Sequence, residues 1–305
     1  MRGSLAVARD LLGVVMTGSS GGAVILQNVT LAYHGCPAVH HLSGEFSRGS
    51  LTAIVGPNGA GKSTLIKGMA GWLRPIDGLI QTAGFGGGDI AYLPQHAEIE
   101  NRFPISVIQT VLLGHWRQIG WARAVTRELR EGAQQALAAV GLAGFERRPI
   151  ETLSAGQFQR VLFARLIVRD AGLILLDEPL AAVDWRTSED LLRLIVSWQR
   201  EGRTVAAVLH DLDQVRAYFP DTLLLARERV AWGPTREALM PQNLRRARRL
   251  SETWSGEGEN HRPAPAPRRS GGAGYADPLT APSLTLRHSR GREGWRQSGE
   301  KRGPA

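Results

Sequence analysis

The stretch Gly56-Pro-Asn-Gly-Ala-Gly-Lys-Ser63 follows a short apolar run, Leu51–Val55, and leads into a helical pattern over Ser63–Trp72. It matches G-x-x-x-x-G-K-[ST], in which a glycine-rich loop joins a strand to a helix. Glycines let successive backbone N–H groups face a phosphate, and the helix N-terminus adds partial positive charge. The pattern therefore predicts a loop that binds the β- and γ-phosphates of a nucleotide.

The residues of this loop have distinct expected roles. Lys62 supplies a flexible positive charge to the phosphate oxygens, and Ser63 is a candidate Mg²⁺ ligand. A coincidental glycine-rich turn is the alternative in a chain with 36 glycines, but only three of its 37 basic residues are lysines and one stands where the motif requires it. The candidate nucleotide-binding residues are Gly56, Pro57, Asn58, Gly59, Ala60, Gly61, Lys62, Ser63 and Thr64.

Two carboxylates, Asp177 and Glu178, follow the apolar run Leu173–Leu176. A strand there would place them at the carboxyl edge of a sheet, where open α/β sheets bind ligands. Such a pair is by itself an ordinary start to a loop, but a preceding phosphate loop favours the catalytic interpretation. Asp177 is then expected to hold Mg²⁺ through water, and Glu178 to polarise the attacking water.

A third apolar run, Val205–Leu209, ends in His210-Asp211. Asp211 with Gln214 fits a helix N-cap with its partner three residues on, which is a structural explanation of this segment. Because three strands would deliver polar residues to one sheet edge, His210 is also a candidate catalytic residue that senses the γ-phosphate.

Strand and helix patterns alternate along most of the chain, which favours an α/β fold with a largely parallel sheet. The segment 103–150 has helical patterns without a core strand and is a candidate inserted helical subdomain. A hairpin-like pair is expected at 222–226 and 229–232. The other expected strands are 24–33, 51–55, 90–93, 172–177 and 204–209, and the expected helices are 63–72, 126–140, 154–169, 187–200 and 211–218.

The two ends differ from the folded body expected at 23–250. Residues 1–22 are expected to be a loose leader, and 251–305, rich in Ser, Gly, Pro and Arg, a disordered basic tail. Much of the net charge of +9 comes from that end, where 13 basic and 6 acidic residues follow Pro241. The tail could bind nucleic acid or anionic lipid, but a solvated appendage is the favoured interpretation, so no nucleic-acid partner is expected.

A further motif, Leu153-Ser-Ala-Gly-Gln157, precedes the two carboxylates. Ser154 and Gln157 form the S-x-x-Q capping box, a sufficient local explanation. Beside the other motifs, the segment resembles L-S-G-G-Q, the signature of the ATP-binding-cassette (ABC) ATPases. In that family the signature binds the γ-phosphate of ATP held by the opposite subunit, so the resemblance implies that Ser154, Gly156 and Gln157 contact nucleotide. Ala155 departs from the family's glycine, and its methyl group is tolerated on a first helical turn but could weaken this contact.

Other positions follow the family's order over roughly residues 23–250. Tyr33 resembles the aromatic residue that stacks on adenine, and Gln95 resembles the Q-loop residue that touches Mg²⁺ and signals to the membrane subunit. The segment 181–184 resembles the D-loop at the dimer interface, and His210 takes the switch-histidine position. The resemblance implies an α/β fold of the P-loop NTPase, ABC nucleotide-binding type. It has a mixed sheet core, an N-terminal antiparallel β part and a helical subdomain inserted at about residues 100–165.

Four short segments, 101–107, 111–115, 215–219 and 241–244, resemble the ATPases of bacterial zinc and manganese uptake systems. The resemblance implies a homodimer that hydrolyses ATP with Mg²⁺ at the cytoplasmic face of the inner membrane. Its partners would be a separate integral membrane permease and, indirectly, an extracytoplasmic solute-binding protein. Uptake of ferric chelates or haem is the alternative cargo. A soluble ABC ATPase for DNA repair or translation is disfavoured by the single cassette, and a third hypothesis makes the basic tail a nucleic-acid-binding module.

Overall fold

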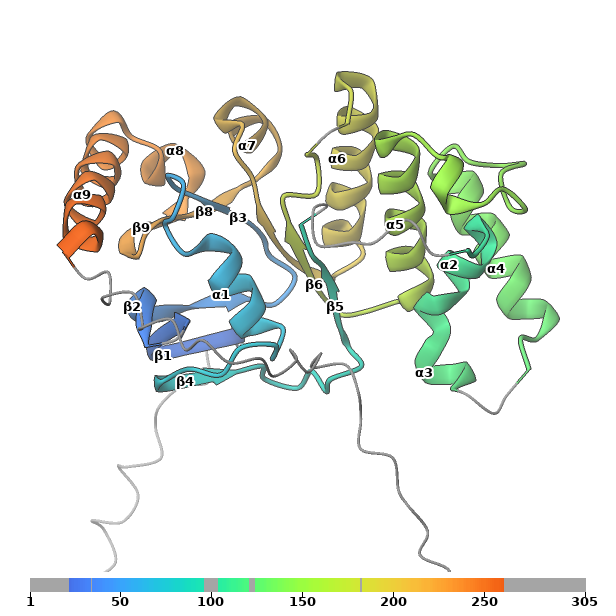
Figure 1. The fold of residues 1–305 in the computed structure, drawn as a ribbon, viewed down its shortest axis with the longest axis horizontal. Helices are drawn as coiled ribbons and strands as arrows, with labels where there is room; N and C mark the ends of the chain where they lie inside the picture. The colour runs from blue at the N-terminus through green and yellow to red at the C-terminus, as the bar shows by residue number, and fades with distance from the viewer. Residues whose placement is uncertain (1–21, 34, 96–103, 121–123, 182, 261–305) are drawn as a thin grey trace, which may run out of the picture. The chain divides into compact units, whose positions relative to one another are not determined.

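The computed structural model describes residues 22–33, 35–95, 104–120, 124–181 and 183–260 (Figure 1). Residues 1–21 of the expected leader and 261–305 of the expected tail lie outside the described residues, as do 101–103 and Ala182. Within the described part, every helix is too short or too polar to span a bilayer.

A six-stranded sheet forms the centre of the fold, in the order β5-β6-β7-β3-β8-β9. Neighbouring strands are parallel except for the antiparallel pair β8–β9, which confirms the predicted parallel sheet and its closing hairpin. The strands β3, β6 and β7 are buried along their whole length, as in parallel sheets covered on both faces. The bounds are β3 (Leu51–Val55), β5 (Ile90–Leu93), β6 (Leu173–Asp177), β7 (Thr204–Val208), β8 (Asp221–Ala226) and β9 (Glu228–Pro234).

A second sheet has three antiparallel strands in the order β2-β1-β4. They are β1 (Gly22–Tyr33), β2 (Cys36–Ser47) and β4 (Asp77–Gln81). This sheet confirms the expected antiparallel N-terminal part, although only β1 was predicted from its own pattern. The strand β4 is largely exposed and begins with Asp-Gly, so neither alternation nor composition marks it as a strand.

Helix α1 (Lys62–Met69) packs between the two sheets. Its side chains Leu65, Ile66 and Met69 share one buried cluster with β1, β2 and one face of the larger sheet. The opposite face packs against a second cluster, to which the helices α5 (Ala155–Arg169), α6 (Trp185–Arg200), α7 (Leu212–Tyr218) and α9 (Pro241–Asn260) contribute together with the helices between β5 and β6. Burial on both faces fixes the strand ends, and with them the loops that follow.

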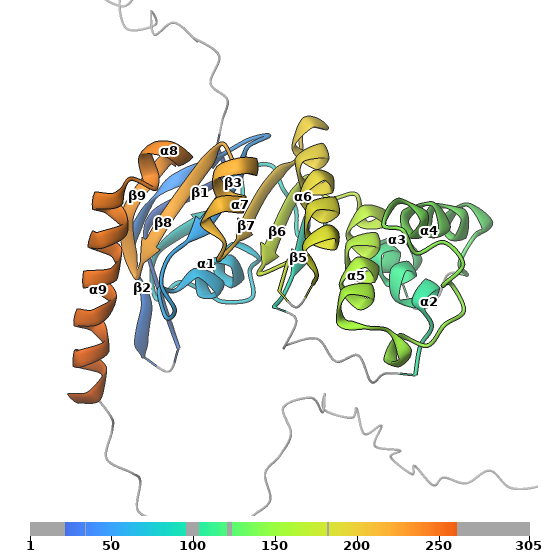
Figure 2. The same ribbon diagram turned by 90° about the horizontal axis from the view of Figure 1, so that it is seen from above.

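The segment between β5 and β6 contains helices α2 (Val107–Leu112), α3 (Trp116–Ile119) and α4 (Arg127–Ala139) and two short 3₁₀ turns, Leu113–His115 and Ile150–Thr152. Helices α2, α4 and α5 lie together at one end of the body in both views (Figures 1 and 2). In the described residues of this segment, β-pairing is limited to an isolated bridge between Ser106 and Pro149. These features support an inserted helical subdomain.

Helix α9 follows the short α8 (Thr235–Ala238) and continues to Asn260. The expectation that disorder begins at residue 251 is therefore wrong for 251–260. This part of the helix was not predicted because residues 251–260 are mainly Ser, Glu and Gly, so apolar residues do not recur there at helical spacing. The earlier part of α9 is anchored by the buried Ala247.

Candidate nucleotide-binding and catalytic site

The loop 56–61 joins the end of β3 to the start of α1 and requires glycine at two positions. Gly56 has φ +155° and Gly61 φ +88°. A Cβ on Gly56 would overlap the carbonyl oxygen of Leu225, and one on Gly61 would overlap that of Ala38. The loop is therefore held between β8 and β2 with no space for a side chain at either position.

Lys62, at the start of α1, points its ammonium group back at this loop. Its Nζ donates hydrogen bonds to the carbonyl oxygens of Gly56 at 3.0 Å and Pro57 at 3.1 Å. Burial lowers the pKa of Lys62, and the carboxylates of Glu178 and Asp177 act in the opposite direction. A desolvated positive charge at a helix N-terminus is suited to binding phosphate.

Ser63 and Asp177 meet although they come from different elements. The Ser63 hydroxyl donates to Oδ1 of Asp177 at 2.9 Å, and Asp177 is fully buried at the end of β6. Hydroxyl and carboxylate oxygens are ligands that Mg²⁺ prefers. The pair therefore fits a Mg²⁺ ion beside the phosphate loop.

The Glu178 carboxylate lies between two polar side chains from neighbouring strand ends. Gln95, just after β5, donates from Nε2 to Oε2 of Glu178 at 2.8 Å. His210, just after β7, places Nε2 2.7 Å from Oε1. The structure thus brings together three residues that the sequence singled out separately. It also gives Glu178 a φ of +50°, which is uncommon for a residue other than glycine.

The segment 153–157 forms the start of α5. Ser154 is its N-cap: the Gln157 N–H donates to the Ser154 hydroxyl at 3.2 Å, and the Ser154 N–H donates to Oε1 of Gln157 at 3.1 Å. This confirms the predicted capping box. Ser154 and Ala155 are exposed, and among the described residues no hydrogen bond of Ser154 or Gln157 reaches the loop 56–64. The helix end is therefore accessible to a ligand from outside the chain's own phosphate loop.

Asp184, in the segment expected to be a D-loop, is the N-cap of α6. The Thr187 hydroxyl donates to Oδ2 of Asp184 at 2.7 Å and the Thr187 N–H to Oδ1 at 3.0 Å, and these bonds lower the pKa of Asp184. A Cβ on Gly156 would be in ordinary contact with Val183 and Asp184. The expected D-loop therefore lies against the start of α5.

Tyr33, the expected adenine-stacking residue, is 43% exposed at the end of β1. It pairs with Cys36 across the β1–β2 hairpin. Because Ala38 of β2 contacts the Gly61 position, this end of the hairpin lies near the phosphate loop.

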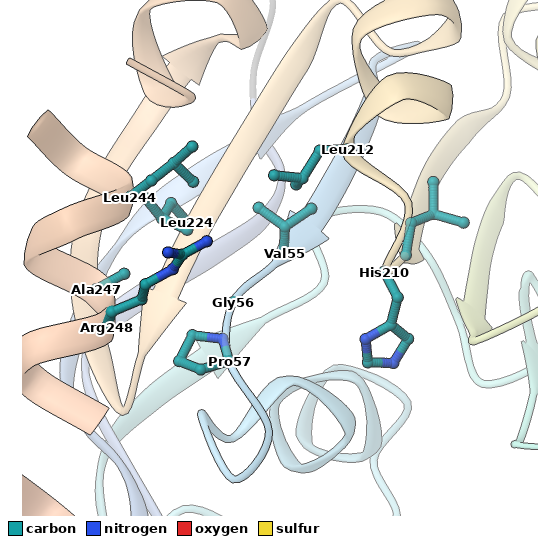
Figure 3. A pocket seen from close by; sticks show the side chains of 10 residues that line it. Val55, Gly56, Pro57, His210, Leu212, Leu224, Leu244, Ala247 and Arg248 are labelled. Carbon is teal, nitrogen blue, oxygen red and sulfur yellow. The ribbon is translucent and has the colours of Figure 1, made fainter. Parts of the chain in front are cut away.

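An apolar pocket of about 160 Å³ opens beside the start of the loop (Figure 3). Helix α9 supplies one wall, with the Arg248 side chain extending toward the pocket, and His210 lies at the opposite side. Sequence reasoning missed Arg248 because it belongs to a basic end segment that only tertiary packing brings to the loop. The lining residues are Val55, Gly56, Pro57, Leu209, His210, Leu212, Leu224, Leu244, Ala247 and Arg248.

Two further residues on α5 were missed. Gln159 donates from Nε2 to the carbonyl oxygen of Pro179 at 2.6 Å, and Arg160 donates from Nη2 to the Thr187 hydroxyl at 2.6 Å. For Gln159, the sequence contained one signal of a buried polar side chain. Gln159 shares the helical spacing i, i+3, i+4 and i+7 with three apolar residues, which places a polar side chain on a buried face.

Comparison with known proteins agrees with this geometry. Residues 39–181 match the family model described as ABC transporter. The manganese transport system ATP-binding protein MntB of Listeria monocytogenes is 37% identical over 223 residues, which cover 72% of this chain and 93% of that protein. The zinc transport system ATP-binding protein TroB of Treponema pallidum is 35% identical over 229 residues, which cover 74% of this chain and 86% of that protein.

Solved structures give the same result. A chain from an ABC transporter described as of the metal-chelate type, in an inward-facing conformation, is 32% identical with a TM-score of 0.66, covering 73% of this chain and 88% of its own length. The dimeric bacterial ABC transporter cassette MJ0796 is 25% identical with a TM-score of 0.62, covering 70% of this chain and 98% of its own. The chain therefore belongs to the family of ATP-binding proteins of ABC transporters.

Proposed function

We propose that this chain is the ATP-hydrolysing subunit of a bacterial manganese or zinc uptake transporter. The observation that carries the catalytic part is the Glu178 carboxylate, held between Gln95 and His210 beside the Lys62 loop. Two copies would act beneath a separate membrane permease at the cytoplasmic face of the inner membrane. An extracytoplasmic solute-binding protein would deliver the cargo to that permease.

In the proposed site, the backbone and side chains of 56–64 bind the phosphates of ATP, and Tyr33 stacks on its adenine. Ser63, Asp177 and Gln95 would hold Mg²⁺, which when bound neutralises negative charge on the phosphate oxygens. Glu178 orients and polarises the attacking water. His210, within hydrogen-bond distance of Glu178, faces the γ-phosphate and limits the directions that the Glu178 carboxylate can take.

The proposed site is completed by a second copy of the chain. Ser154, Gly156 and Gln157 stand at an exposed helix N-terminus, which favours a phosphate ligand. Because none of the hydrogen bonds that Ser154 and Gln157 make within the described part of the chain reaches its own loop, the partner's ATP is the proposed ligand. Two ATP molecules would thus be bound between two copies, each with Lys62 of one copy and Ser154 of the partner subunit.

The proposed cargo rests on the relatives. Both MntB and TroB are matched over more than four-fifths of their length, and their names give manganese and zinc. The similarity to a transporter of the metal-chelate type supports a second candidate, uptake of a chelated metal such as a ferric chelate or haem.

The catalytic proposal is tested by Glu178→Gln, with Glu237→Gln, an exposed glutamate outside the site, as the matched control. ATP hydrolysis by Glu178→Gln should fall by about 100-fold or more while ATP binding is kept, because the amide cannot accept a proton from water. The Glu237→Gln chain should hydrolyse ATP at the wild-type rate. Full hydrolysis by Glu178→Gln would refute the assignment.

The cargo is tested in a strain that lacks this chain and is complemented with either the wild-type or the Glu178→Gln chain. Cellular manganese, zinc and iron are measured by mass spectrometry. Manganese or zinc should fall and be restored only by the wild-type chain. A selective loss of iron would contradict the proposed cargo and favour the chelate.

A further inference from the structure

Gln159 is a buried amide on the inner face of α5. Its side chain is only 2% exposed, and its Nε2 donates to the carbonyl oxygen of Pro179 at 2.6 Å. Its Oε1 is buried and accepts no hydrogen bond from any described residue. An apolar side chain of the same size would avoid that unsatisfied acceptor. Packing therefore does not explain the amide, whereas its bond to Pro179 does.

The acceptor belongs to the turn that carries Glu178. Glu178 has φ +50°, a conformation that persists only where surrounding contacts hold it. Its own carbonyl oxygen accepts a hydrogen bond from the Ala181 N–H at 3.2 Å, and the next carbonyl, that of Pro179, is held by Gln159. The two bonds fix successive peptide groups and thereby the direction in which the Glu178 side chain leaves the backbone.

The donor belongs to the helix that begins at Ser154. A continuous α-helix runs from Ala155 to Arg169, so a movement of its N-terminus moves Gln159 with it. Arg160, the next residue, makes a parallel link to Thr187, which is hydrogen-bonded to Asp184. In Figure 2, α5 lies alongside α6 and beyond the edge of the sheet that contains β6. The start of α5 is thus connected to both the Glu178 turn and the expected D-loop.

We propose that Gln159 is a positioning residue, which couples the position of the Ser154 helix end to the orientation of the Glu178 carboxylate. This inference rests on the proposed roles of Ser154 and Glu178. ATP of the partner subunit, bound at Ser154, would set the position of α5. The Gln159–Pro179 bond then places Glu178 for attack only when that helix is docked.

The first test measures ATP hydrolysis and ATP affinity of the full chain carrying Gln159→Met, which keeps the size and removes the donor. The expected result is a fall in kcat of about 10- to 100-fold with ATP affinity unchanged, since a small displacement of a catalytic group has effects of this order. Leu162→Met is the matched control, because Leu162 is equally buried on the same helix. It should keep wild-type kcat.

The second test is the pH profile of Gln159→Glu, which separates a lost donor from a general packing defect. Burial raises the pKa of a carboxyl group, and its protonated form can donate to the Pro179 oxygen, whereas its ionised form cannot. The kcat of Gln159→Glu relative to wild type should therefore rise as pH falls from about 8 to about 6. A packing defect would lower kcat by the same factor at each pH.

Wild-type kcat in Gln159→Met, or a pH-independent kcat ratio for Gln159→Glu, would overturn the positioning role. If Glu178→Gln is inactive in the same assay, either result leaves the proposed catalytic function standing. If Glu178→Gln hydrolyses ATP normally, the proposed function fails first and the role of Gln159 fails with it.

Discussion

The imidazole Nε2 of His210 lies 2.7 Å from Oε1 of Glu178. The two residues follow adjacent parallel strands, β7 and β6, whose carboxyl ends reach the same sheet edge. His210 remains about half exposed, while the Glu178 side chain is 18% exposed. The histidine can thus contact a ligand at the edge and the carboxylate at the same time.

His210→Ala should lower ATP hydrolysis by about 100-fold, because it removes both the proposed γ-phosphate contact and a constraint on Glu178. His41→Ala is a matched control, since His41 is also exposed and lies in the smaller sheet. Steady-state phosphate release measures both variants. Equal rates for His210→Ala and His41→Ala would contradict the assigned role.

The site was predictable to the extent that it depends on local sequence. The phosphate loop follows from glycine spacing. The places of Asp177 at the end of β6 and of His210 shortly after β7 follow from short apolar runs that end in polar residues. The cap at Ser154 follows from a local pattern, whereas its role toward nucleotide was implied by the resemblance to the ABC signature. Each of these signals lies within a few residues of the feature that it predicts.

Features that depend on tertiary contacts were not predictable in the same way. The partner of Gln159 is the carbonyl of Pro179, twenty residues further along the chain, and a backbone acceptor has no sequence signal. Arg248 reaches the loop region only because α9 packs beside β8. The strand β4 is held by its pairing with β1 rather than by burial of its own side chains.

Ser154→Ala should have two separable effects. Loss of the cap costs about 1 kcal/mol of stability, and loss of the proposed contact weakens ATP-dependent dimerisation. Ser106 is the matched control, because it caps α2 with the same capping box, formed with Gln109. Ser106→Ala should lose similar stability in chemical denaturation.

Only Ser154→Ala should also lose dimerisation, which sedimentation measures in the Glu178→Gln background with ATP. The outcome against the proposal is ATP-dependent dimerisation of Ser154→Ala equal to that of Ser106→Ala.

Two glycines of the phosphate loop separate two costs of adding a side chain, the steric overlap of its Cβ and the strain of a positive φ. Gly59 and Gly61 both have positive φ, at +75° and +88°, but a Cβ on Gly59 meets no atom within 4 Å whereas one on Gly61 overlaps the Ala38 carbonyl. Gly59→Ala should lower the free energy of unfolding only by the cost of holding alanine in the left-handed conformation, about 1–2 kcal/mol. Gly61→Ala should lower the free energy of unfolding, measured in urea, by more than Gly59→Ala does. The Ala38 carbonyl is part of the backbone and cannot rotate away from the new methyl group as a flexible side chain could. Equal losses of unfolding free energy in the two variants would show that β2 shifts at Ala38 to make room for the methyl group.

The Thr187–Asp184 pair gives a pH-dependent contribution to stability. The Thr187 hydroxyl and N–H lower the pKa of Asp184. The pair therefore stabilises the fold at pH values above the unfolded-state pKa, about 3.9. This contribution is lost as the pH falls through the lower pKa of the folded state. Thr187→Val removes the hydroxyl contribution. The Tm difference between wild type and Thr187→Val should therefore be constant from about pH 7 to about pH 5 and shrink below about pH 4.

Thr52→Val is the control for this measurement, because Thr52 is also buried. Among the residues that the structure describes, its hydroxyl hydrogen-bonds only with the Ser50 hydroxyl, a group that does not titrate in this range. Its Tm difference from wild type should stay the same across the whole pH range. If the Thr187→Val difference also stayed constant down to about pH 3, the hydroxyl would not be acting through the ionised Asp184 carboxylate. The remaining effect of Thr187 would then come from its hydrogen bond with Arg160.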